Sequence, residues 1–428
     1  MRILWLKSDL LLPLDKGGKL RTWHLMRHLA RRHEITYLAF REPEQPAANV
    51  EGMKEVASRV ETITRSEPTK GTPRFYADAA LHLLDPLPYA VGKYRSAEYR
   101  RRLAQLLEEQ RFDLIVCDFL FPAVNLPKRL PCPAVMFTHN VESEIWRRHA
   151  ETKTDAIGRL LYGAQYRRML RYERRTLARF DGILAVSDAD RETFARLYPG
   201  AIDQPVHVVP TGVDTEYFAP ARESVNPQSA IRNPHLIFTG SMDWLPNEDA
   251  MIYFCRDVLP AIRAEVPDVA LTIVGRTPTP SVKRLAEERG VTVTGRVDDV
   301  RPYMRDAAVY IVPLRIGGGT RLKIFEAMAM GKAVVSTTIG AEGLPVTDGE
   351  HVLLADDPES FARAVVHLIR DTGHRTRLEA AARALVLARY DWSAVASELE
   401  DALIRFASHG AAEAVPFKTP ISTVGLSS

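Results

Sequence analysis

Residues 312–331 read V-P-L-R-I-G-G-G-T-R-L-K-I-F-E-A-M-A-M-G. A short apolar run predicts a buried strand that ends near Pro313, and three glycines follow it before a helical pattern that stops at Gly331. Glycines let the backbone approach a ligand closely, and the first free N–H groups of a helix attract anions. This order of strand, glycine loop and helix therefore predicts an anion-binding site.

The predicted helix separates its side chains into two faces. If it starts near Thr320, the 3.6-residue period places an apolar arc on the sheet and a polar arc toward a ligand. The apolar arc consists of Leu322, Phe325 and Ala329. The polar arc consists of Thr320, Lys323 and Glu326. Glu326 would lie about 9 Å along the axis from Thr320, about the step from a diphosphate to a ribose. The alternative is a tight turn followed by a solvated face on which Arg321, Lys323 and Glu326 form an i,i+3 ion pair.

The length and composition of the chain indicate a two-domain globular protein. Its 428 residues exceed one comfortable core, and 46% hydrophobic with 26% charged residues is typical of soluble proteins. No apolar run is long enough for a transmembrane helix, and Lys7 and Asp9 interrupt the apolar N-terminus, which disfavours a signal peptide. Three cysteines without a Cys-x-x-Cys spacing indicate a reducing compartment and buried thiols. We therefore expect a cytoplasmic protein.

Charge is distributed unevenly along the chain. Residues 1–215 hold 34 Lys and Arg against 27 Asp and Glu, whereas residues 216–428 hold 23 against 27. A basic N-terminal half favours an acidic partner such as a phospholipid surface or a phosphorylated acceptor. Nucleic acid is disfavoured because the basic residues concentrate on one predicted helix and no recognised binding module accompanies them.

The N-terminal half alternates strands and helices. A strand, the glycine pair Gly17-Gly18, a helix over 19–32 and a second strand form an opening βαβ unit. The pair lacks a full G-x-G-x-x-G spacing, so a chain reversal and a phosphate contact stay equally open. Strands are expected at Arg2–Lys7, Ile35–Phe40, Asp113–Cys117, Ala134–Thr138, Gly182–Val186 and His207–Pro210. His139 follows one of these strands, at the edge where open α/β sheets bind ligands.

Two polar motifs in this half have competing interpretations. Asp188-Ala189-Asp190 has the D-x-D spacing of a metal–sugar-nucleotide site, but it follows Ser187 at a helix start, where capping favours acidic residues. We therefore predict no metal site. The helix expected at Ile157–Arg179 carries seven arginines, with Leu160, Leu161, Leu170 and Leu177 expected to supply its apolar contacts. Its basic residues, within 159–179, could lie against anionic lipid or form a solvated face.

The second half repeats the alternation and predicts a second doubly wound unit. Strands are expected at Leu236–Thr239, Ala270–Val274, Val291–Thr294, Val309–Val312 and Ala333–Ser336. The predicted organisation is an N-terminal domain over 1–212, a linker over 213–234, a second domain over 235–390, a crossover helix over 391–408 and a disordered tail over 409–428. The fold class is thus α/β with two Rossmann-like domains.

The sequence resembles the family 4 retaining glycosyltransferases of the GT-B superfamily. The resemblance rests on residues 313–344, on Thr211-Gly212-Val213-Asp214 with Phe218 and Pro220, on Val274-Gly275 and on Gly295-Arg296-Val297. Residues 238–247, F-T-G-S-M-D-W-L-P-N, look like the exopolysaccharide and exosortase (PEP-CTERM)-associated sugar transferases. The resemblance implies two domains facing across a cleft that closes on substrate, with the last helix crossing back to the first domain.

The resemblance also implies roles for individual residues. Glu326 aligns with the glutamate that binds ribose hydroxyls, and His139 most resembles an acceptor-side histidine. Contacts to the donor nucleotide are expected from Gly17, Gly18, Gly240, Arg296, Val297, Gly318, Gly319 and Thr320. The family's first signature glutamate is replaced by Gly318, and its Arg and Lys after Gly240 are replaced by residues such as Ser241 and Asn247. We therefore expect Arg321 and Lys323 to stabilise the leaving diphosphate, with no metal and no cofactor.

The implied reaction is transfer of a sugar from a UDP- or GDP-linked donor to a lipid-linked or saccharide acceptor, with retention of configuration, in exopolysaccharide biosynthesis. Two alternatives stay open at this point. One is a hydrolysing sugar-nucleotide 2-epimerase, which shares the architecture but needs acid and base groups that the sequence does not place. The other is a non-catalytic nucleotide-sugar-binding protein, given the missing first glutamate. For His139 the alternative is a buried histidine bonded to a strand-end carbonyl.

Overall fold

The chain divides into two compact units. In this computed structural model, residues 1–66, 72–73, 85–152, 155–220, 234–316 and 322–409 are described. Unit 1 comprises Met1–Pro210 with Ala396–Ser428, and unit 2 comprises Thr211–Val395. Four of the predicted site residues, Gly318, Gly319, Thr320 and Arg321, lie outside the described ranges, as does the tail from residue 410.

Unit 1 is built on a seven-stranded parallel sheet with the order β3-β2-β1-β4-β5-β6-β7. Four of its strands are fully or almost fully buried, because helices flank the sheet. The strands are β1 (Arg2–Lys7), β2 (Glu34–Arg41), β3 (Arg59–Thr64), β4 (Leu114–Asp118), β5 (Ala134–Phe137), β6 (Gly182–Ala185) and β7 (Val206–Val208).

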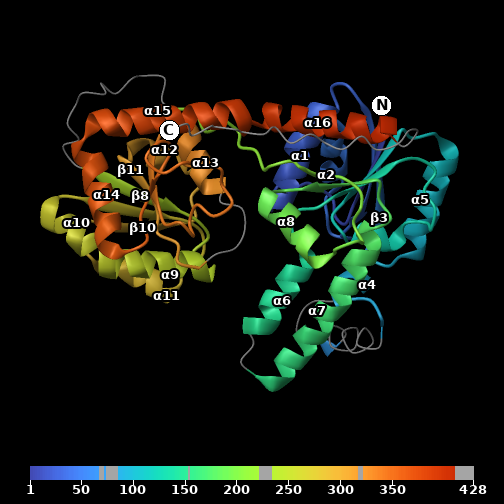
Figure 1. The fold of residues 1–428 in the computed structure, drawn as a ribbon, viewed down its shortest axis with the longest axis horizontal. Coiled ribbons are helices and arrows are strands. Elements are labelled where there is room, and N and C mark those ends of the chain that lie inside the picture. Colours follow the sequence, from blue (N-terminus) through green and yellow to red (C-terminus); the bar gives the residue numbers. More distant parts are fainter. Residues whose placement is uncertain (67–71, 74–84, 153–154, 221–233, 317–321, 410–428) are drawn as a thin grey trace, which may run out of the picture. The chain divides into compact units, whose positions relative to one another are not determined.

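The helices of unit 1 include a long pair that extends from the sheet. Figure 1 shows α6 and α7 running side by side away from the strands. The helices are α1 (Gly17–Leu29), α2 (Ala47–Gly52), α4 (Tyr89–Gly92), α5 (Ala97–Glu109), α6 (Glu142–Thr152), α7 (Ala156–Leu177) and α8 (Asp188–Leu197), with 3-10 turns at Met53–Glu55 and Pro122–Asn125. Ser96, Asp155 and Ser187 cap α5, α7 and α8 with side-chain hydrogen bonds.

The last helix, α16 (Trp392–His409), begins in unit 2 and joins unit 1. The Phe406 ring packs directly on Gly182 of β6, where a side chain would collide with it. Glu400 forms ion pairs with Arg32 and His33. The expectation that the C-terminal helix crosses back to the first domain is therefore confirmed.

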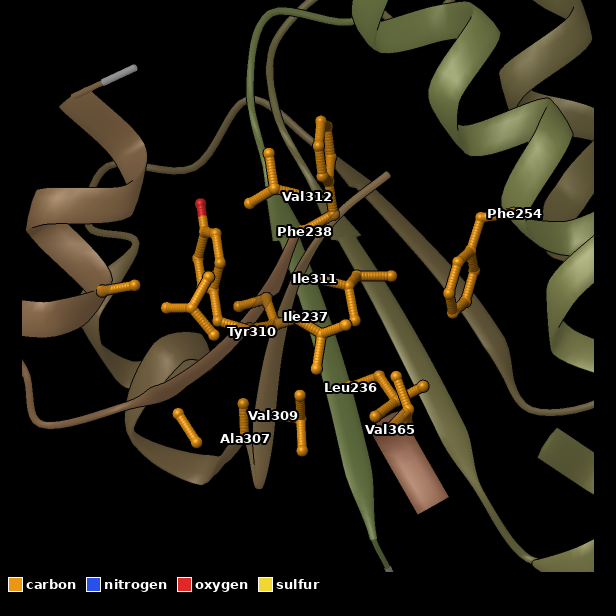
Figure 2. Close-up of a cluster of buried hydrophobic side chains, with 14 of the residues drawn as sticks. Leu236, Ile237, Phe238, Phe254, Ala307, Val309, Tyr310, Ile311, Val312 and Val365 are labelled. Atoms are coloured by element: carbon orange, nitrogen blue, oxygen red, sulfur yellow. The ribbon is translucent and has the colours of Figure 1, made fainter. Parts of the chain in front are cut away.

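Unit 2 is a six-stranded parallel sheet with the order β10-β9-β8-β11-β12-β13. The strands are β8 (His235–Thr239), β9 (Ala270–Val274), β10 (Val291–Gly295), β11 (Val309–Val312), β12 (Ala333–Ser336) and β13 (Leu353–Leu354). Figure 2 shows side chains of β8 and β11 at the centre of the core, with Phe254 and Val365 packed around them.

Helices cover both faces of the second sheet, with α9, α10 and α11 on one side and α12, α13 and α15 on the other (Figure 1). They are α9 (Leu245–Tyr253), α10 (Leu259–Glu265), α11 (Pro280–Arg284), α12 (Arg301–Asp306), α13 (Leu322–Ala329), α14 (Pro358–Arg370) and α15 (Thr372–Arg389), with a π turn at Phe254–Val258 and a 3-10 turn at Leu285–Glu287. Two doubly wound parallel sheets confirm the predicted α/β class.

Several local expectations need correction. The helix predicted from residue 19 begins at Gly17, so the glycine pair forms its first turn. Strand β3 was not predicted, because Arg59–Thr64 lies at the edge of the sheet and lacks the continuous apolar run of the inner strands. Helix α6 was also missed. Leu160 and Leu161 do not supply packing contacts, since they are 68% and 42% exposed. Cys117 and Cys255 are buried, but Cys132 is only partly so.

Candidate functional site

Each sheet has a topological switch point, and several of the predicted site residues that the structure describes lie beside these two points. In unit 1, β1 lies between β2 and β4, so the strands that follow β1 are added first on one side of it and then, from β4 on, on the other. In unit 2, β8 lies between β9 and β11 in the same way. Open α/β sheets bind ligands outside the carboxyl ends of strands at such points. Lys7 ends β1, and Gly240 follows the end of β8.

The switch point of unit 1 holds a buried polar network centred on Asp118. The parallel register places Lys7 directly beside Asp118, and Lys7 Nζ lies 2.8 Å from Asp118 Oδ1. Trp5 Nε1 donates to Asp118 Oδ2 at 2.9 Å, and Thr22 Oγ1 donates to the same oxygen at 2.7 Å. Burial alone would raise the pKa of Asp118, but Lys7 and His139 hold it well below its usual range. Asp118 is therefore an ionised, fully paired carboxylate.

His139 belongs to this network. Its Nε2 lies 2.8 Å from Asp118 Oδ1, and its ring stacks on Phe119 with centroids 4.0 Å apart. Burial, together with the charges of Lys7 and Arg21, lowers the pKa of His139 to about 3 against the opposing effect of Asp118. The expected alternative, a histidine bonded to a strand-end carbonyl, is wrong, because its partner is a carboxylate.

The first turn of α1 lies against His139. A Cβ atom at Gly18 would be 3.2 Å from the Phe119 ring and 3.5 Å from His139 Nδ1, whereas one at Gly17 would meet nothing within 4 Å. Lys16 precedes the helix without a side-chain cap. Among the described residues, no acceptor bonds the N–H groups of Gly17 and Gly18. The uncapped N-terminus of α1 and the imidazole ring of His139 therefore lie next to each other.

Arg21 is a buried cation in the same region. Its guanidinium donates to the carbonyl oxygens of Thr138 and Val209, which follow β5 and β7, and lies 4.4 Å from the centroid of the Phe137 ring. Burial lowers its pKa, and no carboxylate forms an ion pair with it within the described ranges. Arg21 therefore ties strand ends together and adds positive charge near His139.

In unit 2, two glycines allow close packing at the carboxyl ends of β8 and β9. A Cβ atom at Gly275 would lie 1.6 Å from the Gly240 carbonyl oxygen, so only glycine fits there. A Cβ atom at Gly240 would lie 2.7 Å from Asn247 Nδ2 and 2.9 Å from Lys323 Nζ. The backbone at Gly240 is therefore in direct contact with the polar side chains of α9 and α13.

Lys323 and Asn247 form a pair at this position. Lys323 Nζ donates to Asn247 Oδ1 at 2.9 Å and lies 4.1 Å from the centroid of the Phe238 ring. Asn247 Nδ2 in turn donates to the Ser241 carbonyl oxygen at 2.9 Å. The structure thus places a cation from α13 beside Gly240, in the region where the family's own cations are missing from the sequence.

Glu326 lies one helical turn after Lys323. It is partly buried, and burial raises its pKa to about 7, with Lys323 acting in the opposite direction. The Tyr310 hydroxyl is close enough for Glu326 to raise the pKa of that phenol further. The predicted faces of α13 agree with this placement in part, because Phe325 and Ala329 are buried and Lys323 and Glu326 are half-buried. Leu322, predicted on the apolar face, is half-buried as well, since it stands in the first turn of the helix.

The remaining predicted residues are less tightly placed. Arg296 is exposed after β10, and Val297 packs partly on the core of unit 2. Ser187 caps α8 by accepting from the Asp190 N–H, while Asp188 pairs with Arg191. Within the described ranges, no group of three or more metal-ligating side chains is assembled. No helix of that part of the chain is both long and apolar enough to cross a membrane.

Sequence reasoning missed the partners that hold the site residues. Asp118, Lys7, Thr22 and Trp5 around His139 were not predicted to interact. The available signal was polarity at the last position of two apolar strands, where Lys7 and Asp118 stand. Asn247 was noted in the sequence only as a substitute for a missing cation.

Comparison with known proteins agrees with this geometry. Residues 16–217 match the family model described as Glycosyltransferase Family 4, and residues 233–371 match the one described as Glycosyl transferases group 1. Sucrose-phosphate synthase from Thermosynechococcus elongatus superposes with a TM-score of 0.65 at 17% identity, over 95% of this chain and 99% of that chain. The fold is therefore GT-B. Residues 16–217 and 233–371 are thus each similar to a glycosyltransferase family model.

Curated relatives share part of the chain. The phosphatidyl-myo-inositol mannosyltransferase of Mycobacterium tuberculosis H37Rv is 32% identical over 231 residues, which cover 51% of this chain and 58% of that protein. The D-inositol 3-phosphate glycosyltransferase of Xylanimonas cellulosilytica is 30% identical over 54% of this chain and 58% of that protein. The alignments thus span little more than half the length of these relatives. HepE of Anabaena, solved with UDP-glucose, matches with a TM-score of 0.62 at 17% identity, over 95% of this chain and 100% of that one.

Proposed function

We propose that this protein transfers a sugar from a nucleoside diphosphate sugar to a hydroxyl group of a lipid-linked or saccharide acceptor. The observation that carries the proposal is the placement of Lys323 and Glu326 one turn apart on α13, with Lys323 Nζ beside Asn247 and Gly240 at the switch point of unit 2. A cation followed by a carboxylate suits a diphosphate followed by a ribose. The names of the relatives, which include mannosyltransferases, support the same class of reaction.

In the proposed reaction, the C1–O bond of the donor breaks and the diphosphate leaves with additional negative charge. Lys323 and Arg321 would stabilise that charge, and Glu326 would accept hydrogen bonds from the ribose hydroxyls. The uncapped N–H groups of Gly17 and Gly18 would donate to a phosphate oxygen. Gly240, Arg296, Val297 and the residues 318–320 would line the rest of the donor site. UDP and GDP are the nucleotides that we propose.

We propose that the anomeric configuration is retained. A phosphate oxygen of the donor would take the acceptor proton on the same face of the sugar, so that no protein base is required. His139 would orient the sugar or the acceptor. We also propose that the reaction needs no metal, since Asp188 and Asp190 belong to the start of α8, where Asp188 pairs with Arg191 and the Asp190 N–H donates to Ser187. The role we assign is cell-surface or exopolysaccharide biosynthesis.

The test is a panel of UDP-, GDP- and ADP-linked sugars measured by thermal shift. A ligand at 100 times its Kd adds about 2.7 kcal/mol to the free energy of unfolding. The stabilising donor is then incubated with and without extracted acceptor lipids and oligosaccharides. Transfer that requires an acceptor supports the proposal. Fast turnover without acceptor would indicate an epimerase, and binding without any transfer would indicate a non-catalytic protein.

We propose further that α7 contacts an anionic membrane from the cytoplasmic side. Leu160 and Leu161 are exposed near its start. Five exposed arginines form no ion pair among the described residues, namely Arg159, Arg167, Arg171, Arg174 and Arg175. Exposed leucines beside unpaired arginines suit an interface with acidic lipids.

Vesicle flotation tests this contact. The protein should float with phosphatidylglycerol-containing vesicles and remain behind with phosphatidylcholine vesicles. Replacing both Leu160 and Leu161 with Ser should reduce flotation, whereas Leu245→Ser, at an exposed leucine of unit 2, should leave it unchanged. Equal flotation with both vesicle types would exclude the charge-based contact.

A further inference from the structure

The hydrogen-bond network around Asp118 determines where the proton of His139 resides. Lys7 Nζ and His139 Nε2 contact Asp118 Oδ1, while Trp5 Nε1 and Thr22 Oγ1 contact Oδ2. Lysine and tryptophan can only donate, so each carboxylate oxygen already accepts from an obligate donor. A proton on Asp118 would have to compete with these donors. Asp118 is therefore ionised, and the nitrogen of His139 that faces it must carry a hydrogen.

The other ring nitrogen then holds a lone pair. The charges that face His139 are those of Lys7 from β1, Arg21 from α1 and Asp118 from β4. Lys7 already neutralises Asp118, so a second proton on the ring would add an unbalanced positive charge to a buried site that also holds Arg21. Burial and these two cations keep the pKa of His139 far below neutrality. The ring is consequently neutral, with hydrogen on Nε2 and none on Nδ1.

His139 Nδ1 lies beside the first turn of α1, 3.5 Å from the position that a Cβ atom at Gly18 would take. Among the described residues, no protein group donates a hydrogen bond to Nδ1. The uncapped N–H groups of Gly17 and Gly18 begin the same helix. Nδ1 is thus an acceptor beside the two N–H donors that we assign to a phosphate oxygen. A hydroxyl group can donate to Nδ1, whereas a fully ionised phosphate or carboxylate oxygen cannot.

We propose that Asp118 and Lys7 are positioning residues that lock His139 in the Nε2–H tautomer, so that Nδ1 is a permanent acceptor for one hydroxyl group of the bound sugar or acceptor. His139 is then a neutral selector of hydroxyl groups and takes no part in proton transfer. This assignment rests on the proposed function for the identity of the ligand. The tautomer itself depends only on contacts within unit 1.

Nitrogen NMR of protein labelled with ring-¹⁵N histidine tests the tautomer directly. His139→Gln identifies the His139 signals by difference, and the other histidines, such as His235 in unit 2, serve as internal references. The expected pattern is a protonated Nε2 and an unprotonated Nδ1, unchanged from about pH 5.5 to pH 8, where an ordinary histidine titrates. A doubly protonated ring at pH 6, or hydrogen on Nδ1, would overturn the proposal.

The double variant Lys7→Met/Asp118→Asn is decisive. Lys7 no longer donates at the Oδ1 position, so the amide nitrogen of Asn can take that position and donate to Nε2, which moves the ring hydrogen to Nδ1 and presents a donor to the substrate. We expect kcat/KM to fall about 10- to 100-fold, the effect of one lost and mismatched buried hydrogen bond. The double change also removes the ammonium that Asp118→Asn alone would leave without a counter-ion, so this protein should fold even if the single variant does not. Lys7→Met alone, which keeps the carboxylate, should keep the hydrogen on Nε2.

The outcomes separate this proposal from the proposed function. A folded Lys7→Met/Asp118→Asn protein with an unaltered His139 tautomer, or with wild-type transfer despite an altered one, would refute the positioning role. If the wild-type protein shows the expected tautomer but transfers no sugar to any acceptor, the glycosyltransferase assignment fails and the tautomer assignment is supported by the spectrum alone.

Discussion

The two sheets each place a carboxylate near a switch point, and the pKa values of the two carboxylates shift in opposite directions. Asp118 in unit 1 accepts hydrogen bonds from four side chains, and its pKa lies well below the usual range. Glu326 in unit 2 is also desolvated, but Lys323 alone opposes that effect, so its pKa rises to about 7. Both groups are removed from water, and the difference lies in the number of donors that replace it.

The comparison teaches which part of the site is complete without a ligand. The donors to Asp118 come from the protein, so this network holds its geometry without a ligand. Glu326 has no comparable set of donors among the described residues, and in the proposed function the ribose hydroxyls supply them. The network of unit 1 is therefore preorganised, whereas Glu326 in unit 2 lacks such a set of donors among the described residues.

The largest expected effect is loss of the Asp118 network. Asp118→Ala leaves the Lys7 ammonium buried without its counter-ion, so the free energy of unfolding should fall by about 3–5 kcal/mol. Chemical denaturation followed by circular dichroism measures this change. Glu109→Ala removes an ion-pair partner of Arg59 and Arg102 at the surface and should change stability little. Equal losses in the two variants would show that the Asp118 network is no stronger than a surface pair.

The next effect concerns the cation of unit 2. Lys323→Ala should reduce kcat by about 10² or more, equivalent to about 2.7 kcal/mol of transition-state stabilisation, because the departing diphosphate loses its counter-charge. Steady-state kinetics with the donor identified by thermal shift measures it. Lys283→Ala on α11, an exposed lysine of the same unit, is the matched control. Wild-type turnover of the Lys323→Ala protein would show that Lys323 does not stabilise the leaving diphosphate.

The contrast also shows what the sequence could predict. Most strands and the helices after them were predicted because buried parallel strands are continuous apolar runs. The pairing of Lys7 with Asp118 was not predicted, because it joins residues 111 positions apart and depends on β1 and β4 being neighbours in register. The Lys323–Asn247 bond, which joins residues 76 positions apart, was not predicted for the same reason. Residue types at strand ends thus indicate where a site lies, but sheet order decides which side chains meet.

Glu326 offers a test of the contrast through pH. Its pKa of about 7 exceeds the ordinary 4.5, so the folded state binds the extra proton between these values and stability declines as pH rises from about 4.5 to 7. A donor whose ribose hydroxyls bond the carboxylate favours its ionised form. Donor affinity should therefore rise as pH increases through about 7, with release of a proton on binding.

Calorimetry in buffers of different ionisation enthalpy measures that proton. Glu326→Gln should abolish its release, and Glu326→Ala should raise the donor KM at least about tenfold through loss of charged hydrogen bonds. An unchanged KM in the alanine variant would exclude the ribose role. Proton release that persists in the glutamine variant would assign the titration to another group.

The smallest effect distinguishes the two glycines that begin α1. Both Gly17 and Gly18 lie in the first helical turn, where Ala is preferred over Gly by up to about 1 kcal/mol. A methyl group at Gly17 meets open space, so Gly17→Ala should leave the free energy of unfolding unchanged or raise it slightly. At Gly18 the methyl group would lie 3.2 Å from the Phe119 ring, which stacks on His139 and is held by the Asp118 network.

Because that stack cannot shift without disturbing the bond from His139 to Asp118, Gly18→Ala should lower stability by about 1 kcal/mol despite its better helix propensity. Thermal unfolding of the two variants side by side provides the measurement, and each is the control for the other. If Gly18→Ala instead stabilises the protein as much as Gly17→Ala does, the His139–Phe119 stack yields easily. Preorganisation of unit 1 would then extend only to Asp118 and its direct partners.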